Sequence, residues 1–306
     1  MGLYDVVLSW DHQQEQGWIV SQGWPLSEAA QRGQRAYRRL RKFLSLLEAP
    51  GPSPLSATAS AATGRYELPA AQLAPQFATR WSGDWTSNFS SSGFRDAVAK
   101  CVDYIGAGDI FQVNLAQRLL TKALCSPEKL YLHLRSQNPA PFSGYADFGR
   151  TQVISCSPER FLEVQERQIE TRPIKGTRPR LSDPTADRGM GQLLLHSAKD
   201  RSENVMIVDL LRNDLSRIAD PNSLQVSQLC GLEKYPFVWH LVSVLRARLA
   251  AGHTVCDVLA ATFPGGSITG APKIRAMEII SELEPTQRGP YCGSLGYISC
   301  AGDMDT

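Results

Sequence analysis

The 306-residue sequence lacks several features that would place it in a specialised class of protein. Its seven cysteines are scattered and include no C-x-x-C pair, which argues against a zinc site or a disulfide framework and favours a reducing, cytoplasmic compartment. No apolar run approaches the roughly 18 residues that span a bilayer, and no leader-like basic and apolar segment opens the chain. The formal net charge is only +2, so neither nucleic acid nor an acidic membrane is predicted as a partner.

The residues that are present suffice for a large hydrophobic core. Hydrophobic residues make up 42% and charged residues 20%, which excludes a disordered protein. Residues 49–92 are rich in Ala, Pro, Ser and Gly and predict a linker, so a boundary near Ser92 divides the chain into residues 1–92 and 93–306. Ahead of this linker, residues 3–22 predict a hairpin and residues 27–48 a helix with a basic, solvated face.

Helical and extended patterns mix irregularly after residue 93. Helices are predicted from an N-cap at Ser91 or Ser92 to Gly106, and then at 186–199, 203–218, 237–250, 253–261 and 272–283. Strands are predicted within 111–120 and at 153–156, 160–164 and 169–174. This irregular order predicts an α+β fold rather than a doubly wound α/β sheet.

A basic segment at 170–180 contains one lysine, Lys175, among three arginines, in a backbone fixed by proline and glycine. A nucleophilic lysine needs desolvation or cationic neighbours to lower its pKa from about 10.4, and Arg172 and Arg178 are the candidate neighbours. The alternative is a solvated lysine in a basic turn. This segment alone does not decide between them.

Glu159, in Ser-Pro-Glu-Arg-Phe at 157–161, lies between an extended run and an aromatic residue. A half-buried carboxyl at such a place can have its pKa raised into the range of a general acid. The alternative is an edge-strand glutamate that pairs with Arg160. Both interpretations are compatible with the local sequence.

Glu203 and Asp200 precede a helix on the same face as the apolar stripe of Ile207, Leu211 and Leu215. A carboxylate aligned with a buried stripe must be paired or bound to a cation, and Mg²⁺ takes one or two carboxylates together with a substrate oxyanion. The alternative is an acidic first turn that complements the helix dipole.

The glycine-rich segment Gly-Gly-Ser-Ile-Thr-Gly-Ala-Pro-Lys at 265–273 places Pro272 at a predicted first helical position. Several backbone N–H groups could converge there on an anion. The segment matches neither the Walker A loop nor the dinucleotide fingerprint, so a substrate carboxylate is a better candidate than a nucleotide. Simple helix capping would also explain it.

Five segments together resemble the chorismate-utilising enzymes, in that family's order. They are Phe-Gln-Val-Asn-Leu-Ala-Gln-Arg at 111–118, Ser-Pro-Glu at 157–159, Pro-Ile-Lys-Gly-Thr at 173–177, residues 202–214 and residues 265–273. The resemblance runs from about residue 94 to residue 306, and residues 1–48 resemble the end of the family's N-terminal region. It implies an α+β enzyme of two packed β-sheets flanked by helices, with residues 93–306 as the chorismate-binding catalytic domain.

Two positions distinguish the branches of this family. Lys175 occupies the position at which anthranilate synthases have alanine, in a segment similar to Pro-Ile-Ala-Gly-Thr. Gln112 occupies the position at which isochorismate-forming members have a lysine that activates water. The resemblance thus implies amination of chorismate at C4, with ammonia from a partner glutamine amidotransferase subunit. The product would be 4-amino-4-deoxychorismate, a precursor of p-aminobenzoate and folate. An anthranilate synthase component and a catalytically silent, truncated homologue remain alternatives.

The resemblance also implies a role for each candidate residue. Lys175 would add to C2 of chorismate and expel the C4 hydroxyl, which Glu159 would protonate, a kind of step typically worth about 10²–10⁴-fold. Glu203 would give one carboxylate to Mg²⁺, which would bind the ring carboxylate of the substrate. The remaining candidates would contact the substrate: Gln112, His240, Gly266, Ser267, Thr269 and Tyr291.

The resemblance is incomplete at both ends of the chain. Thr306 comes just before the family's carboxylate-binding arginine, a glycine-rich substrate loop and a second metal-ligating glutamate. The first residues correspond to a point partway through the N-terminal region, which in relatives carries a buried tryptophan site. We therefore expect a fragment with unpaired strands and an incomplete metal shell.

Overall fold

The computed structural model describes residues 2–49, 75–81 and 84–306 of the chain. Two compact units are distinguished, residues 1–65 and residues 66–306. Most of the linker predicted over residues 49–92 lies outside the described residues. Within the described ranges, no helix is both long enough and apolar enough to cross a membrane.

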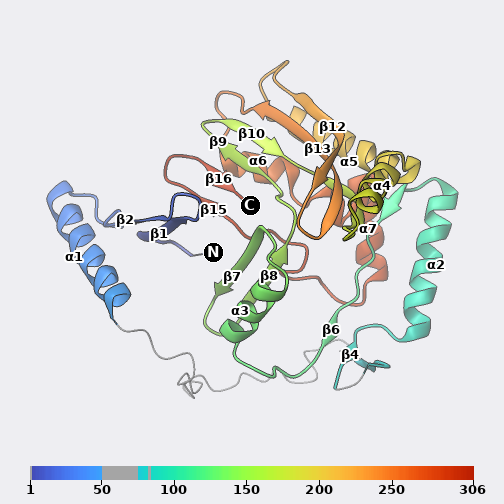
Figure 1. Cartoon of the computed structure of the whole chain (residues 1–306), viewed down its shortest axis with the longest axis horizontal. Coiled ribbons are helices and arrows are strands. Elements are labelled where there is room, and N and C mark those ends of the chain that lie inside the picture. Colours follow the sequence, from blue (N-terminus) through green and yellow to red (C-terminus); the bar gives the residue numbers. More distant parts are fainter. Residues whose placement is uncertain (1, 50–74, 82–83) are drawn as a thin grey trace. The chain divides into compact units, whose positions relative to one another are not determined.

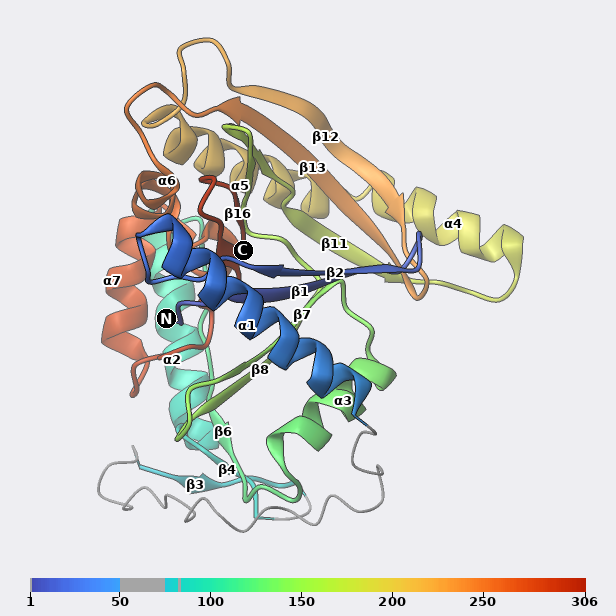
Figure 2. The same cartoon turned by 90° about the vertical axis from the view of Figure 1, so that its left-hand side faces the viewer.

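The described residues of the first unit, 2–49, form a hairpin and one helix (Figure 2). Strands β1 (Val6–Asp11) and β2 (Gln16–Ser21) pair antiparallel, and the Asp11 carboxylate accepts hydrogen bonds from backbone N–H groups of the turn. Helix α1 (Ala29–Glu48) turns Leu40, Leu44 and Leu47 towards an apolar groove that the hairpin also lines. The hairpin and the helix predicted for this region are confirmed.

A seven-stranded antiparallel sheet organises the second unit (Figure 1). The strand order is β11-β13-β10-β9-β16-β15, with β12 also paired to β13. The strands are β9 (Glu163–Gln165), β10 (Gln168–Thr171), β11 (Ile174–Pro179), β12 (Gln225–Lys234), β13 (Val238–Arg248), β15 (Tyr297–Ile298) and β16 (Met304–Asp305). Because β13 pairs with β10, β11 and β12, it is the central support of the sheet.

Helices cover this sheet through aliphatic side chains. Ile207 and Leu211 of α5 (Ala198–Ser216) pack against Leu245 of β13, and a larger cluster contains Leu162, Ile169 and Leu215. Each fully buried aliphatic side chain stabilises the fold by about 1.5–3 kcal/mol. Three further helices follow β11 in the chain: α4 (Pro184–Leu195), α6 (Val255–Thr262) and α7 (Lys273–Leu283).

Several short elements complete the second unit. The helices are α2 (Ser91–Ala107) and α3 (Pro127–Gln137), with the 3-10 turn η2 (Gly266–Ile268). Small sheets are formed by β3 (Phe77–Ala78), β4 (Thr86–Ser87) and β6 (Leu119–Leu120), by β7 (Phe142–Asp147) and β8 (Gln152–Ser157), and by β5 (Gln112–Val113) and β14 (Gly270–Ala271). The α+β class predicted from the sequence is confirmed.

One predicted helix is wrong, because residues 237–250 contain strand β13. Residues 240–245 are all buried, so the run shows no alternation of polar and apolar residues that would have identified a strand. Smaller differences occur in α2, whose N-cap is Ser90 and whose C-cap is Gly108. The buried residues of α2 are Ala97 and Cys101.

Candidate active site

Lys175 lies in strand β11, not in the turn that its proline and glycine neighbours predicted. The pairing of β11 with β13 shifts register between Lys175 and Thr177, and Gly176 has a φ of +79°. A bulge therefore separates the lysine from the rest of the strand. The predicted cationic neighbours have their charges compensated by carboxylates. Arg172 Nη2 lies 2.7 Å from Glu233 Oε1, and Arg178 Nη2 lies 3.3 Å from Asp200 Oδ2.

We expect Gly176→Ala to lower the free energy of unfolding by about 1–3 kcal/mol, because a side chain is strained at positive φ. A Cβ at this position would also lie 2.8 Å from Leu194 Cδ1 and 2.9 Å from Asp200 Cβ. Thermal unfolding followed by circular dichroism measures the change. Gly189→Ala in α4 is the control, because no atom lies within 4 Å of its added Cβ and alanine favours helices. Equal melting temperatures for the two variants would contradict the prediction.

Glu159 lies where three segments distant in sequence meet. Its Oε1 accepts hydrogen bonds from the Ile174 backbone N–H at 3.2 Å and from the Ser267 hydroxyl at 3.4 Å. Burial raises the pKa of this carboxyl, against the opposing effects of the Ile174 hydrogen bond and the nearby Lys175 charge. The alternative pairing with Arg160 is wrong, because Arg160 binds Glu163 and Asp305 instead. A partly buried acid whose pKa is raised, close to a lysine, is a candidate general acid.

The glycine-rich segment forms η2 and β14, and α7 begins only at Lys273, with Pro272 as its N-cap. Gly266 allows close approach to α5, because a Cβ would lie 2.8 Å from Leu210 Cδ2. Thr269 is buried and donates its hydroxyl to the Gly265 carbonyl at 2.9 Å. The turn is thus held by its own side chains, and helix capping alone does not account for it.

Gln112 lies in β5, paired with Ala271 of β14. Its Oε1 atom is buried and has no hydrogen-bond partner within the part of the chain that the structure describes. A buried acceptor without a donor is costly. This amide oxygen is therefore available to a donor group of a ligand next to the glycine-rich segment.

His240 lies on β13 beside the strand that carries Lys175. Its Nδ1 is 3.0 Å from the Thr177 hydroxyl, and its ring meets the Tyr235 ring edge to face at 5.1 Å between centroids. Burial lowers the pKa of His240, which favours the neutral ring. Thr177 was not predicted as a site residue. It stands in the Lys175 segment, but only the bulge at Gly176 brings it opposite His240.

Glu203 lies in the second turn of α5, where its Oε1 is 3.9 Å from Lys199 Nζ. Asp200, which shares this face, is paired with Arg178. Among the described residues, no three His, Cys, Asp or Glu side chains are grouped so that they could hold a metal ion. The adjacent Asn204 is fully buried and donates to the Leu241 carbonyl at 3.1 Å, which fixes this turn against β13. Glu203 can therefore offer one carboxylate.

Tyr291 lies after α7 and is 61% exposed. Its backbone N–H donates to the Arg288 carbonyl at 3.3 Å. The structure thus brings Glu159, Lys175 and Ser267 together in one group and joins Thr177 to His240. The hydrogen bonds and ion pairs described for Glu203 and Tyr291 do not join them to either group.

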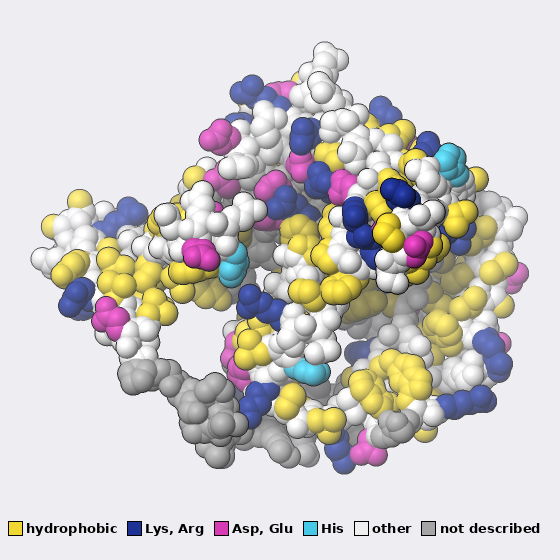
Figure 3. All heavy atoms as spheres, in the orientation of Figure 1, with side chains coloured by type: hydrophobic (Ala, Val, Ile, Leu, Met, Phe, Trp, Pro, Cys, Tyr) yellow, Lys and Arg dark blue, Asp and Glu magenta, His cyan; other side chains and the backbone are white. Residues whose placement is uncertain are grey.

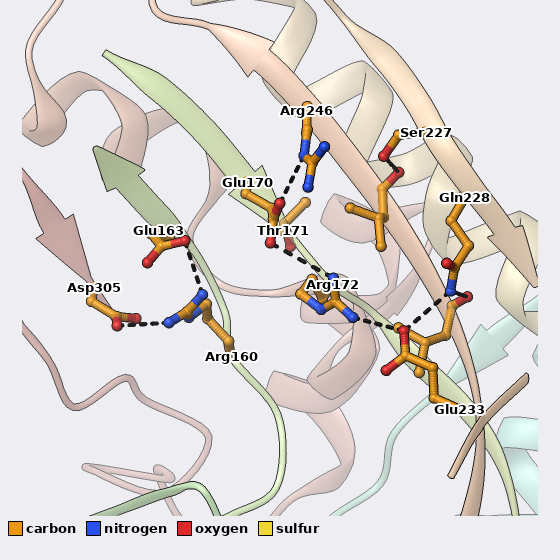
Figure 4. Close-up of polar contacts among 12 residues, drawn as sticks. Arg160, Glu163, Glu170, Thr171, Arg172, Ser227, Gln228, Glu233, Arg246 and Asp305 are labelled. Carbon is orange, nitrogen blue, oxygen red and sulfur yellow. Dashed lines mark hydrogen bonds and ion pairs between the residues drawn. The ribbon is translucent and has the colours of Figure 1, made fainter. Parts of the chain in front are cut away.

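The sheet also carries a row of alternating charges (Figure 4). Arg160 pairs with Glu163 and Asp305, Arg246 pairs with Glu170, and Arg172 pairs with Glu233. Acidic and basic side chains are likewise interspersed on the surface seen in Figure 3. This distribution agrees with the small net charge and offers no extended basic surface on that face.

Comparison with known proteins identifies the family of the chain. The sequence matches the family described as "chorismate binding enzyme" over residues 1–306, so the chain belongs to that family. It is 48% identical over 237 residues to aminodeoxychorismate synthase component 1 of Klebsiella aerogenes, covering 77% of this chain and 52% of the relative. It is 45% identical over 222 residues to anthranilate synthase component 1 of Aquifex aeolicus (strain VF5), covering 72% of this chain and 45% of the relative.

A solved structure shows the same fold. Anthranilate synthase component I from Streptococcus pneumoniae TIGR4 superimposes with a TM-score of 0.80 at 32% identity, covering 99% of this chain and 62% of that chain. The predicted chorismate-utilising fold is thereby confirmed. The chain spans about half the length of the curated relatives it matches.

Proposed function

We propose that this chain carries the catalytic residues for amination of chorismate at C4, with residues 93–306 as its chorismate-binding region. The observation that carries the proposal is the group formed by Lys175, Glu159 and Ser267, in which a partly buried acid with a raised pKa lies near an amine. The 48% identity to an aminodeoxychorismate synthase component 1 supports the same reaction.

The chemistry follows from the two central residues. Lys175, as the free amine, adds to C2 of chorismate, the ring double bonds shift, and the C4–O bond breaks. Glu159 donates a proton to the departing hydroxyl, which leaves as water. Ammonia then adds to C4 and displaces the lysine amine from C2. One chorismate and one ammonia thus give one 4-amino-4-deoxychorismate and one water.

The other candidates would bind the substrate. Gly266 and Ser267 would present backbone N–H groups to a carboxylate, Gln112 would accept from a hydroxyl, and neutral His240 would face the ring. Thr269 and Tyr291 would complete this set. Thr269 would shape the turn that binds the substrate, because its hydroxyl is bonded to Gly265 and its backbone N–H and carbonyl are bonded to Gly266 and Asn114.

Two further components belong to the proposal. A separate glutamine amidotransferase subunit would supply ammonia, and the product would enter p-aminobenzoate and folate synthesis. The cytoplasm is the compartment we infer, because the scattered cysteines contain no C-x-x-C pair and predict no disulfide framework.

The direct test is to incubate the chain with chorismate, Mg²⁺ and ammonium at mildly alkaline pH and to identify products by mass spectrometry. We expect aminodeoxychorismate. Anthranilate as the product would replace the proposal by anthranilate synthase chemistry. Chorismate left unchanged would show that this chain is catalytically silent.

Mg²⁺ fits Glu203, because the ion pair of this carboxylate with Lys199 is long, at 3.9 Å, and Mg²⁺ keeps several waters when one or two carboxylates bind it. The ion would supply positive charge to the substrate's ring carboxylate. We expect Glu203→Gln to raise the Mg²⁺ concentration that half-saturates chorismate binding about tenfold or more. Titration calorimetry measures it. Asp209→Asn on the same helix is the control, because Asp209 is 80% exposed, and a similar shift in both variants would remove the assignment.

A further inference from the structure

A buried ion pair that follows α7 has no role in the reaction described above. The side chains of Arg288 and Glu284 are only 14% and 5% exposed. Arg288 donates to the Glu284 carboxylate from Nε at 2.9 Å and from Nη2 at 2.6 Å. Hydrogen bonding to Glu284 raises the pKa of Arg288. The guanidinium is therefore a fixed charge that Glu284 orients.

The remaining donors of Arg288 bind two backbone carbonyls from separate segments. Nη1 donates to Ile268 in η2 at 2.7 Å, and Nη2 donates to Asn114, just after β5, at 2.5 Å. Glu284 Oε1 accepts from the Ala116 backbone N–H at 2.8 Å. One ion pair thus connects the glycine-rich segment with the segment that follows Gln112.

Both segments carry residues proposed to bind the substrate, close to the carbonyls that Arg288 binds. Ile268 stands between Ser267 and Thr269, and Asn114 comes two residues after Gln112. The backbone bond from Asn114 N–H to the Thr269 carbonyl is 2.8 Å long and lies beside the guanidinium. Tyr291 follows by one turn, through its N–H bond to the Arg288 carbonyl.

The planar fork of arginine is what makes this arrangement possible. A guanidinium has five N–H donors in fixed directions, so it can bind a carboxylate and two carbonyls together. A lysine ammonium is a compact charge on a flexible stem and cannot reproduce those directions. Because the pair is buried, water cannot easily replace a bond that is lost.

We propose that Arg288, oriented by Glu284, is a positioning residue. It holds residues 265–271 against residues 112–116, in the geometry that binds chorismate. This inference rests on the proposed function. It concerns residues to which the catalytic steps assign no part.

The test combines hydrogen exchange with ligand binding on the purified 306-residue chain. In Arg288→Lys we expect the amides of residues 266–271 to exchange about 10- to 100-fold faster than in the wild type, the range for loss of hydrogen bonds to a charged group. The dissociation constant for chorismate in the presence of Mg²⁺ should rise by a similar factor. Exchange in α5 should not change. If Arg288→Lys does not fold, Glu284→Gln replaces it in the test. This variant keeps the shape of the side chain and should give a smaller increase in exchange at residues 266–271.

The matched control is Arg246→Lys, since Arg246 also binds a glutamate but lies on the sheet, 60% exposed. It should leave exchange at 266–271 unchanged. Unchanged exchange there in both Arg288→Lys and Glu284→Gln would overturn the inference, and so would a uniform increase over the whole chain. If the wild-type chain does not bind chorismate, both the proposed function and the role of Arg288 in chorismate binding are overturned, whatever the rates of hydrogen exchange at residues 266–271.

Discussion

Replacing Lys175 with alanine is expected to reduce formation of aminodeoxychorismate on the order of 10³-fold or more, because alanine has no nucleophile to add to C2. The covalent intermediate should also disappear. Intact-protein mass spectrometry of the wild-type chain with chorismate and Mg²⁺, without ammonia, should show a mass increase equal to chorismate less one water. Lys175→Ala should show none.

Lys122→Ala is the matched control for this experiment. Lys122 is 85% exposed and pairs only loosely with Asp84, so its loss should change neither the adduct nor the rate. The role of Lys175 would have to be abandoned if Lys175→Ala kept wild-type turnover. An adduct that persists in this variant would move the nucleophile to another residue.

Replacing Glu159 with glutamine is expected to lower the rate of C4–O cleavage by about 10²–10⁴-fold, because glutamine cannot donate a proton to the leaving hydroxyl. The pH dependence gives a second signature. Burial raises the pKa of Glu159, so the acid form persists to higher pH than in a free glutamate. The wild-type rate should fall as pH rises through that raised pKa, whereas the rate of Glu159→Gln should lack this fall.

The same shift has a consequence for stability. Because the folded-state pKa of Glu159 lies above its unfolded value, its contribution is present below the unfolded pKa and is lost as pH rises through the folded pKa. Glu159→Gln should therefore be at least as stable as the wild type at pH 8. Glu278→Gln, at a 58% exposed position, serves as the control. A melting temperature well below wild type for Glu159→Gln would indicate a structural carboxylate instead.

Local patterns were sufficient to predict the helical part of the site. The apolar residues of α5 recur with a period of about 3.6 residues, and this period places Asp200 and Glu203 on one face of the helix. It can be recognised from the sequence of the helix alone. Strand β13 was predicted as a helix because residues 240–245 are buried on both faces and show no two-residue period, and buried and exposed residues alternate only from Leu245 to Arg248. His240 was therefore placed by the family resemblance, without knowledge of its strand.

The contacts that join the site lie outside the reach of local patterns. The bond from Ser267 to Glu159 spans 108 residues, and that between Thr177 and His240 spans 63. The Thr177 contact depends on a bulge that shifts the register after Lys175. The positioning role of Arg288 was not predicted, because its bonds to the Ile268 and Asn114 backbone carbonyls leave no trace in the sequence.

The position of β16 in the sheet has a consequence for synthesis of the chain. β16 pairs with β9, and Thr306 donates to the Leu162 carbonyl across 144 residues. A ribosome that adds about 5–20 residues per second needs on the order of ten seconds to make that stretch. During this time the edge of β9 has no partner strand, which favours pairing with other nascent chains. Pairing with β16 then covers this edge of β9 once residues 304–305 have been made.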